Sequence, residues 1–193
     1  MTIPARAGRL RVIGGSLKGR RLQTLPGDAI RPTADRVREA LFDILGPTIL
    51  GADFLDVYAG TGAVGIEALS RGAGSVAFIE HDKQAVDLLR RNLSIAGDQS
   101  HRASVIPYDP ARAVPMLEQE GRAFDLVFMD PPYLGGELDR GIRIVGRSRL
   151  LRQGSLVVAE HDASVDPPAS DCLADFRTVP YGRAALTLYR LVH

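Results

Sequence analysis

The chain has 193 residues, of which 45% are hydrophobic and 24% are charged, which predicts one domain with a substantial core. Cys172 is the single cysteine, so an intramolecular disulfide is excluded, and no apolar run is long enough to span a membrane. The formal net charge of +1 excludes a uniformly basic protein but conceals an uneven distribution of charge.

The N-terminal part of the chain is strongly basic. Residues 1–38 contain nine Lys and Arg against two acidic residues, a net charge of +7, whereas the remainder has a net charge of −6. A basic arm on a mildly acidic body favours a polyanionic partner such as nucleic acid, although a solvated tail without a partner is the alternative. No long apolar segment follows the first arginines, so we expect no secretory signal and a cytoplasmic location.

The first elements are a predicted hairpin and a helix. Two short strands, 10–13 and 20–25, are joined by a glycine-containing turn at 15–19. A lone hairpin is marginal in water, so we expect it to pack on the body or on a partner. A helix is then predicted to start near Thr33, its expected N-cap, and to end at Gly46.

Strands and helices alternate from residue 53 onward. Strands are predicted at 54–58, 74–80, 103–106, 124–129 and 155–160, and helices at 63–70, 82–96, 111–118 and 138–150, with Gly97 stopping the second of these helices. Residues 176–180 and 184–191 are expected to form a closing antiparallel hairpin. This alternation predicts an α/β fold with a doubly wound, mostly parallel seven-stranded sheet.

A glycine-rich turn stands between the first strand and its helix. Residues 56–65 read DVYAGTGAVG and contain G-x-G-x-x-G, whose glycines allow a tight turn and close approach of a ligand. Glu80 ends the next strand, where an acid accepts both ribose hydroxyls of an adenosine cofactor. Both a nicotinamide dinucleotide and S-adenosylmethionine fit this pattern. Asp56 would repel a pyrophosphate and attract an ammonium or sulfonium, which favours the methyl donor unless its side chain points away.

The segment Asp130-Pro131-Pro132-Tyr133 follows a buried apolar run. It stands at the carboxyl end of a strand, where open α/β sheets bind ligands. The prolines stiffen the turn and leave carbonyl groups free to accept hydrogen bonds. A carboxylate beside a fixed carbonyl suits the exocyclic amine of a base, on which Tyr133 can stack. The segment is similar to the DPPY motif of amino-group methyltransferases, although a strand-ending turn with a surface tyrosine is the alternative.

Four segments in order extend this resemblance over nearly the whole chain. They are 11–15 with 18–20, the R-P-T segment 31–42, the glycine loop, and Asp130 to Tyr133. Together they resemble the bacterial 16S rRNA guanine-N2 methyltransferase family, class I enzymes that use S-adenosylmethionine. The resemblance implies a Rossmann-like fold with a small N-terminal hairpin. Asp43-Ile44 stands where the family more often has Asn and Trp, and Tyr58 and Thr61 replace the commoner Phe and Ser.

The resemblance also implies roles for individual residues. The cofactor would contact Asp56, Tyr58, Gly60, Gly62, Glu80 and Asp109, the last near the adenine amino group; catalysis would use Asp130, Pro131 and Tyr133. RNA would be bound by Arg11, Lys18, Arg20, Arg21, Arg31 and Arg36, and Arg38 is expected to face the substrate as well. Residues 1–28 would form an RNA-binding arm and 29–193 the methyltransferase domain. We expect a monomer that requires no metal, with 16S rRNA or an assembling small ribosomal subunit as partner.

The expected chemistry is methyl transfer to a weak nucleophile, because the lone pair of the guanine amino group conjugates with the ring. Asp130 would accept one N–H and the Pro131 carbonyl the other, and the carboxylate would stabilise the developing positive charge. Whether Asp130 also removes the proton is open at this stage. The base must leave any stack to reach the site, so an unpaired guanine is the expected target.

Three other functions stay open. One is an adenine-N6 or cytosine-N4 methyltransferase, since those bases also carry an exocyclic amine. Another is a non-catalytic RNA-binding assembly factor, and the third is a nicotinamide oxidoreductase. His81 and His161 each stand in a Glu-His-Asp triplet, but without spaced ligands we expect solvated loop histidines rather than a metal site.

Overall fold

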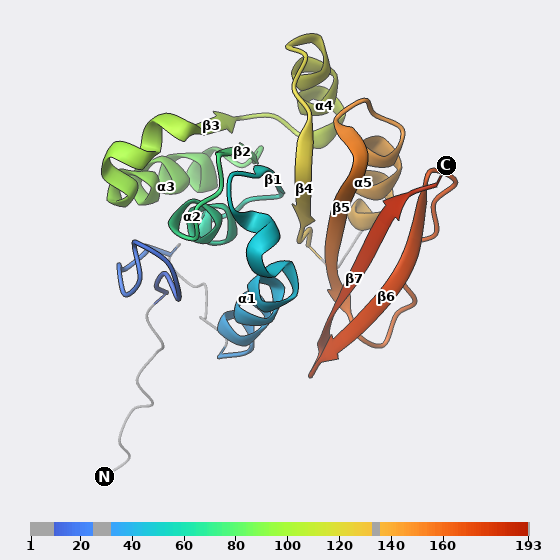
Figure 1. Cartoon of the computed structure of the whole chain (residues 1–193), viewed down its shortest axis with the longest axis horizontal. Helices are drawn as coiled ribbons and strands as arrows, with labels where there is room; N and C mark the ends of the chain where they lie inside the picture. The colour runs from blue at the N-terminus through green and yellow to red at the C-terminus, as the bar shows by residue number, and fades with distance from the viewer. Residues whose placement is uncertain (1–9, 25–31, 133–135, 193) are drawn as a thin grey trace.

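The computed structural model describes residues 10–24, 32–132 and 136–192. In this part of the chain, one seven-stranded sheet has the strand order β3-β2-β1-β4-β5-β7-β6 (Figure 1). Its strands are β1 (Asp53–Val57), β2 (Ser75–Ile79), β3 (Ala103–Ile106), β4 (Phe124–Met129), β5 (Leu151–Asp162), β6 (Leu173–Tyr181) and β7 (Ala184–Leu191). Strands β1 to β5 pair in parallel, and β7 joins β5 and β6 through antiparallel pairing. The predicted doubly wound sheet is therefore confirmed.

Helices cover both faces of the sheet. They are α1 (Pro32–Leu45), α2 (Ala63–Ser70), α3 (Lys83–Leu93), α4 (Pro110–Gln119) and α5 (Glu137–Gly146). One hydrophobic core joins α1, α2 and α3 to the sheet, and the second core joins α4 and α5 to its other face. Burial on both faces explains why β4 is almost wholly apolar rather than alternating, and why four of the five residues of β1 are buried. None of the described helices is long and apolar enough to cross a membrane.

The register of the parallel strands sets the position of the site. Val57, the last residue of β1, pairs with Met129, the last residue of β4, and Met129 pairs with Ala159 of β5. The next residues of these three strands therefore emerge side by side at the carboxyl edge of the sheet. Strands β4 and β5 point toward the lower part of Figure 1, where α1 lies.

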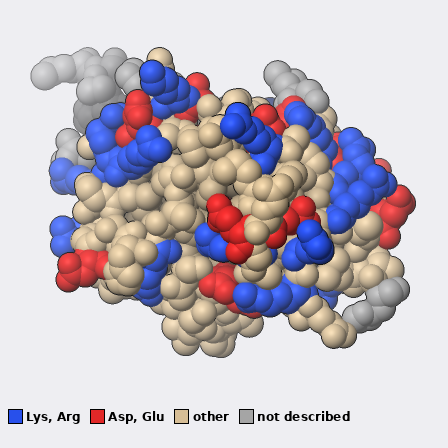
Figure 2. All heavy atoms as spheres, turned by 90° about the horizontal axis from the view of Figure 1, so that it is seen from above, with Lys and Arg blue, Asp and Glu red and all other residues tan. Residues whose placement is uncertain are grey.

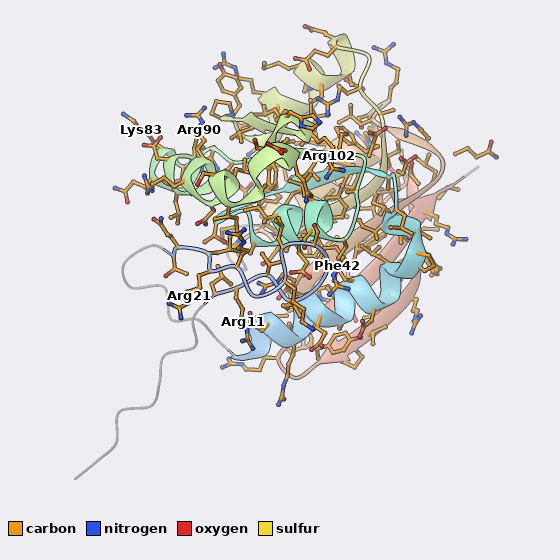
Figure 3. All side chains as sticks on the ribbon, turned by 60° about the vertical axis from the view of Figure 1, so that its left-hand side comes forward. Arg11, Arg21, Phe42, Lys83, Arg90 and Arg102 are labelled. Atoms are coloured by element: carbon orange, nitrogen blue, oxygen red, sulfur yellow. The ribbon has the colours of Figure 1, made fainter. Side chains whose placement is uncertain are left out.

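The N-terminal segment 10–24 packs on α1 and α2 rather than standing free. Its two arms are joined by one antiparallel bridge, between Arg11 and Arg21. The two predicted strands are therefore observed only as this one bridged pair of residues. Four apolar residues of the segment belong to the first core: Leu10, Val12, Leu17 and Leu22. Figure 3 shows this segment, with Arg11 and Arg21, beside α1, while Phe42 of α1 faces α2. The predicted docking on the body is thus observed, because these side chains have no other apolar surface to cover them.

Several predicted boundaries were wrong. The first helix begins at Pro32, so Thr33 lies inside it rather than capping it. Helix α3 ends at Leu93 and continues as a 3-10 segment, within which Gly97 has φ +53°. Helix α5 ends at Gly146, and β5 is longer than predicted at both ends. These errors lie at element ends, where local signals are weakest.

Candidate active site

A cavity of about 300 Å³ opens at the carboxyl edge of the sheet, between the glycine loop, α1 and the end of β4. Four residues predicted to bind cofactor or substrate line it: Asp56, Tyr58, Gly60 and Asp130. Arg38 and Glu160 also line it. The pairing of β1 with β4 and of β4 with β5 explains why residues so distant in the sequence meet here.

Asp56 is a buried carboxyl at the beginning of the glycine loop. Its side chain is 2% exposed, and Oδ2 accepts a hydrogen bond of 2.9 Å from the Gly65 amide in the first turn of α2. Burial raises the pKa of Asp56 to about 7; the Gly65 hydrogen bond opposes this shift, and the charge of Glu80 adds to it. Its carboxyl is therefore divided between the neutral and charged forms near neutral pH.

Asp130 follows directly after β4. It is an exposed residue that lines the cavity. Removal from bulk water raises the pKa of Asp130 well above its usual range, and the charges of Glu160 and Asp56 raise it further. Three carboxyl groups therefore share one cavity, which is unfavourable for an anionic ligand and favourable for a cationic one.

Glu80 organises the loop instead of lining the cavity. Its Oε2 accepts a 2.8 Å bond from the Gly60 amide, and Oε1 accepts bonds of 2.8 Å from the amides of His81 and Asp82. Gly62 has φ +77°, and a Cβ there would lie 2.0 Å from Cδ1 of Leu89, so glycine is required. These residues fix the shape of the glycine loop.

Asp109 is placed at the carboxyl edge as a helix cap. It is the N-cap of α4 and accepts a bond from the Arg112 amide at 3.2 Å. Its predicted contact with the adenine amino group stays a prediction, since Asp109 does not line the described cavity.

Tyr58 connects the glycine loop to the segment after Asp130. Its backbone has φ +66°, a conformation that side chains rarely adopt. The phenol donates a 2.9 Å hydrogen bond to the carbonyl of Glu137, the first residue of α5. A Cβ at Gly141 of α5 would lie 3.0 Å from the Tyr58 hydroxyl oxygen, so a side chain there would require the phenol to shift. Burial raises the pKa of Tyr58 to about 12, so the phenol stays protonated and keeps this bond.

Comparison with known proteins places this site in a family. The model of a family described as Conserved hypothetical protein 95 matches residues 10–190. The Escherichia coli (strain K12) protein named Ribosomal RNA small subunit methyltransferase D is 37% identical over 156 residues, 81% of this chain and 76% of that protein. The chain belongs to this methyltransferase D family. The Haemophilus influenzae protein of the same name is 36% identical and covers 81% of each chain. The solved structure of the Escherichia coli protein yhhF, 36% identical, has a TM-score of 0.80 and covers 95% of this chain and 98% of its own.

In this member of the methyltransferase D family, the motif after β4 is described only in part. Asp130 lines the cavity beside the glycine loop, whereas Pro131 and Pro132 line a neighbouring cavity of about 160 Å³. Glu160 lines both cavities. Tyr133 lies outside the described residues, so its stacking role stays a prediction.

A buried glutamate holds the N-terminal segment against α2. Glu67 is 0% exposed, and its two carboxylate oxygens accept bonds of 2.7 Å from the amides of Ile13 and Gly14. Arg71 pairs with the same carboxylate at 2.8 Å. Sequence reasoning missed Glu67, although one acidic residue in the otherwise apolar helix AVGIEALS was a usable signal.

Arg38 links the N-terminal segment to the cavity. The side chain is 5% exposed, and its Nη2 donates to the Arg11 carbonyl at 2.8 Å and to Asp35 at 2.9 Å. Its Nε lies 4.0 Å from Glu67 Oε2 and has no hydrogen-bond partner among the described residues. Arg38 also lines the cavity wall, and its expected contact with the substrate stays a prediction.

The residues predicted to bind RNA are exposed and lie near one another. Arg11, Lys18, Arg20, Arg21 and Arg36 all have exposed side chains. Arg11, Lys18 and Arg36 line a groove of about 340 Å³ between the N-terminal segment and α1. Arg31 lies outside the described residues.

One prediction about the histidines was wrong. His161 is a buried residue of β5, 6% exposed, whose Nε2 lies 2.8 Å from the hydroxyl of Thr187. The extension of β5 to Asp162, through pairing with β7, draws it into the sheet. His81 is exposed, as predicted. The described residues contain no group of three or more side chains suited to hold a metal.

Proposed function

We propose that this chain transfers a methyl group from S-adenosylmethionine to the exocyclic N2 of a guanine in 16S rRNA. The observation that carries the proposal is the meeting of Asp130, Asp56 and Gly60 around one cavity. The names of the curated relatives support ribosomal RNA of the small subunit as the substrate. The choice of guanine N2 rests on the family resemblance and on the motif after β4.

The cavity fits the proposed cofactor. A Cβ at Gly60 would meet no atom within 4 Å, so this glycine leaves open space beside the loop for a ligand. Asp56, Asp130 and Glu160 supply negative charge on the cavity wall, which suits the sulfonium and ammonium groups and disfavours a pyrophosphate. When bound, the cofactor supplies an electrophilic methyl group.

Asp130 is the residue placed to act on the base. A cation beside its carboxyl lowers the pKa, so a loaded site favours the carboxylate form that accepts an N–H bond. The carboxylate then orients the amine and stabilises the positive charge that develops on nitrogen, without any need to remove the proton in the same step. The Pro131 carbonyl is proposed to accept the second N–H of the amine, and the Tyr133 ring is proposed to stack on the base.

The exposed basic residues of the N-terminal segment are proposed to bind RNA phosphates. Phosphate contacts position a nucleic acid without selecting its sequence, so the target base must be selected at the cavity. The proposed setting is the cytoplasm, with naked 16S rRNA or an assembling small subunit as partner.

Labelled methyl transfer to RNA tests this function. Total RNA from cells lacking this protein is incubated with the purified chain and S-adenosylmethionine carrying a tritiated methyl group, and the labelled nucleoside is identified. We expect N2-methylguanosine in 16S rRNA. Label in N6-methyladenosine or N4-methylcytidine would mean that the target base is adenine or cytosine rather than guanine. The same assay is repeated with isolated small ribosomal subunits. If the chain binds the cofactor but transfers no methyl group to total RNA or to these subunits, a non-catalytic assembly factor is favoured.

A further inference from the structure

Strand β6 contains a bulge that changes which residues face α1. Asp175 pairs with Tyr189 and Arg177 with the adjacent Leu188, so Phe176 is the extra residue. Before the bulge, Leu173 belongs to the core on the α5 side; after it, Tyr181 packs in the core on the α1 side. The bulge therefore turns Arg177 and Tyr181 toward α1, whereas regular alternation would direct them to the opposite face.

Arg177 and Tyr181 line a groove of about 510 Å³ with α1. Arg36 and Glu39 of α1 line this groove and also the groove beside the N-terminal segment. The two grooves therefore meet on α1. The turn that follows Tyr181 lies at the carboxyl edge, because Tyr181 pairs with Ala184 and Ala184 pairs with Asp162 at the end of β5.

Across the two grooves, the exposed basic side chains Arg11, Lys18, Arg36 and Arg177 outnumber the acidic Glu39 and Asp43, and this excess of positive charge favours a polyanion. Arg36 and Arg177 are exposed, and neither forms an ion pair with another described residue. Asp35 is paired with Arg38, which leaves Glu39 and Asp43 as the acidic residues between the two arginines. By contrast, the face seen from above in Figure 2 carries basic and acidic side chains interspersed with each other.

We propose that Arg177 and Tyr181 of β6, with Arg36 of α1, form a second RNA-contacting surface across α1 from the N-terminal segment. This proposal rests on the RNA methyltransferase function proposed above. Phosphates would lie beside Arg36 and Arg177, and ribose hydroxyls would donate to Glu39 and Asp43. The half-buried ring of Tyr181 would form an aromatic wall of the groove. RNA would then be held on both sides of α1.

The test measures binding of a fluorescently labelled RNA stem-loop with a guanine-rich loop over a series of salt concentrations. Arg177→Ala should weaken binding several-fold and reduce the slope of log K against log salt by up to about one. Arg177→Lys keeps the charge and should retain the slope. In methyl transfer, Arg177→Ala should raise KM for RNA and leave kcat and the cofactor Kd unchanged.

Arg149 provides a matched control. It is an exposed arginine that precedes β5, at the amino edge of the sheet, opposite the proposed surface. The Arg149→Ala variant should bind RNA with the same slope of log K against log salt as the native chain. A native slope in Arg177→Ala, or an equal loss in Arg149→Ala, overturns the second surface while the methyltransferase function stands. Failure of the native chain to bind the stem-loop overturns the second surface, whereas the proposed function is overturned only by the absence of methyl transfer in the labelled assay above.

Discussion

Three carboxyl groups meet in the proposed site, where burial and the charges of Glu160 and Asp56 raise the pKa of Asp130. Asp56, Asp130 and Glu160 line one cavity, and both aspartates have raised pKa values. Such an arrangement costs stability when the carboxyls ionise, and a bound cation offsets this cost. The cavity is therefore suited to hold a positively charged cofactor against a base amine.

Replacement of Asp130 tests its role in positioning the amine. Asp130→Asn removes the negative charge, and we expect methyl transfer to fall by about 100-fold or more, since a preorganised electrostatic contact is lost. Cofactor affinity measured by calorimetry should fall far less than turnover, because Asp56 and Glu160 remain in the cavity wall. Asp87→Asn, on the exposed surface of α3, is the control and should keep native turnover. Near-native turnover in Asp130→Asn would show that this carboxylate does not act on the base.

The raised pKa of Asp56 predicts a pH-dependent stability. Because the folded-state pKa is raised from 3.8 to about 7, the contribution of the neutral carboxyl is fully present below pH 3.8 and is lost as pH rises through about 7. The free energy of unfolding falls by at most about 4 kcal/mol, because each tenfold change in the ionisation constant corresponds to ~1.4 kcal/mol. Urea unfolding without cofactor should show a smaller decrease in the free energy of unfolding from pH 5 to pH 8 in Asp56→Asn than in the native chain. Equal decreases would mean that Asp56 ionises normally.

Among the elements, the N-terminal segment and α2 are joined by the buried carboxylate of Glu67. The segment contributes Leu10 to the cavity wall, and Asn92 of α3 also bridges it to the glycine loop through Gln23 and Thr61. If this segment binds RNA as proposed, these contacts would hold the RNA in a fixed position relative to the cavity. The division of the chain at residue 28 stays a proposal, since residues 25–31 are not described.

Glu67→Gln should loosen this attachment. The new amide nitrogen would face a backbone N–H donor or Arg71, and the half-buried Arg71 would lose its counter-charge. We expect a decrease of about 3–5 kcal/mol in the free energy of unfolding, measured in urea. Hydrogen exchange should be faster at Ile13 and Gly14 than in the native chain. Glu120→Gln, at the exposed end of α4, serves as the control and should leave the free energy of unfolding unchanged. Similar decreases in the free energy of unfolding for both variants would refute the role of Glu67 in attaching the segment.

The whole molecule is expected to discriminate between cationic and anionic cofactors. At a concentration 100 times Kd, S-adenosylmethionine should raise the free energy of unfolding by about 2.7 kcal/mol, because it binds the folded state alone. A nicotinamide dinucleotide should have little effect, since its pyrophosphate would meet three carboxyl groups. Thermal unfolding with each cofactor measures this difference. Stabilisation by the dinucleotide instead would support an oxidoreductase.

The sequence by itself determined the order and type of nearly all elements. Apolar runs such as Phe124–Met129 and the glycines of the loop are local signals, because a buried strand or a positive φ restricts the residues at that position. Asp130 and the glycine loop could therefore be recognised as candidate site residues from motif and context alone.

Only the tertiary structure decided how these residues meet. Pairing of β1 with β4 places Tyr58 and Asp130 side by side, and pairing of β4 with β5 brings Glu160 beside Asp130. The extension of β5 along β7 buries His161. The contacts of Glu67 and the effect of the β6 bulge likewise join segments distant in the chain. Such contacts depend on the packing free energy of the complete sheet and its helices, which no local pattern of residues contains.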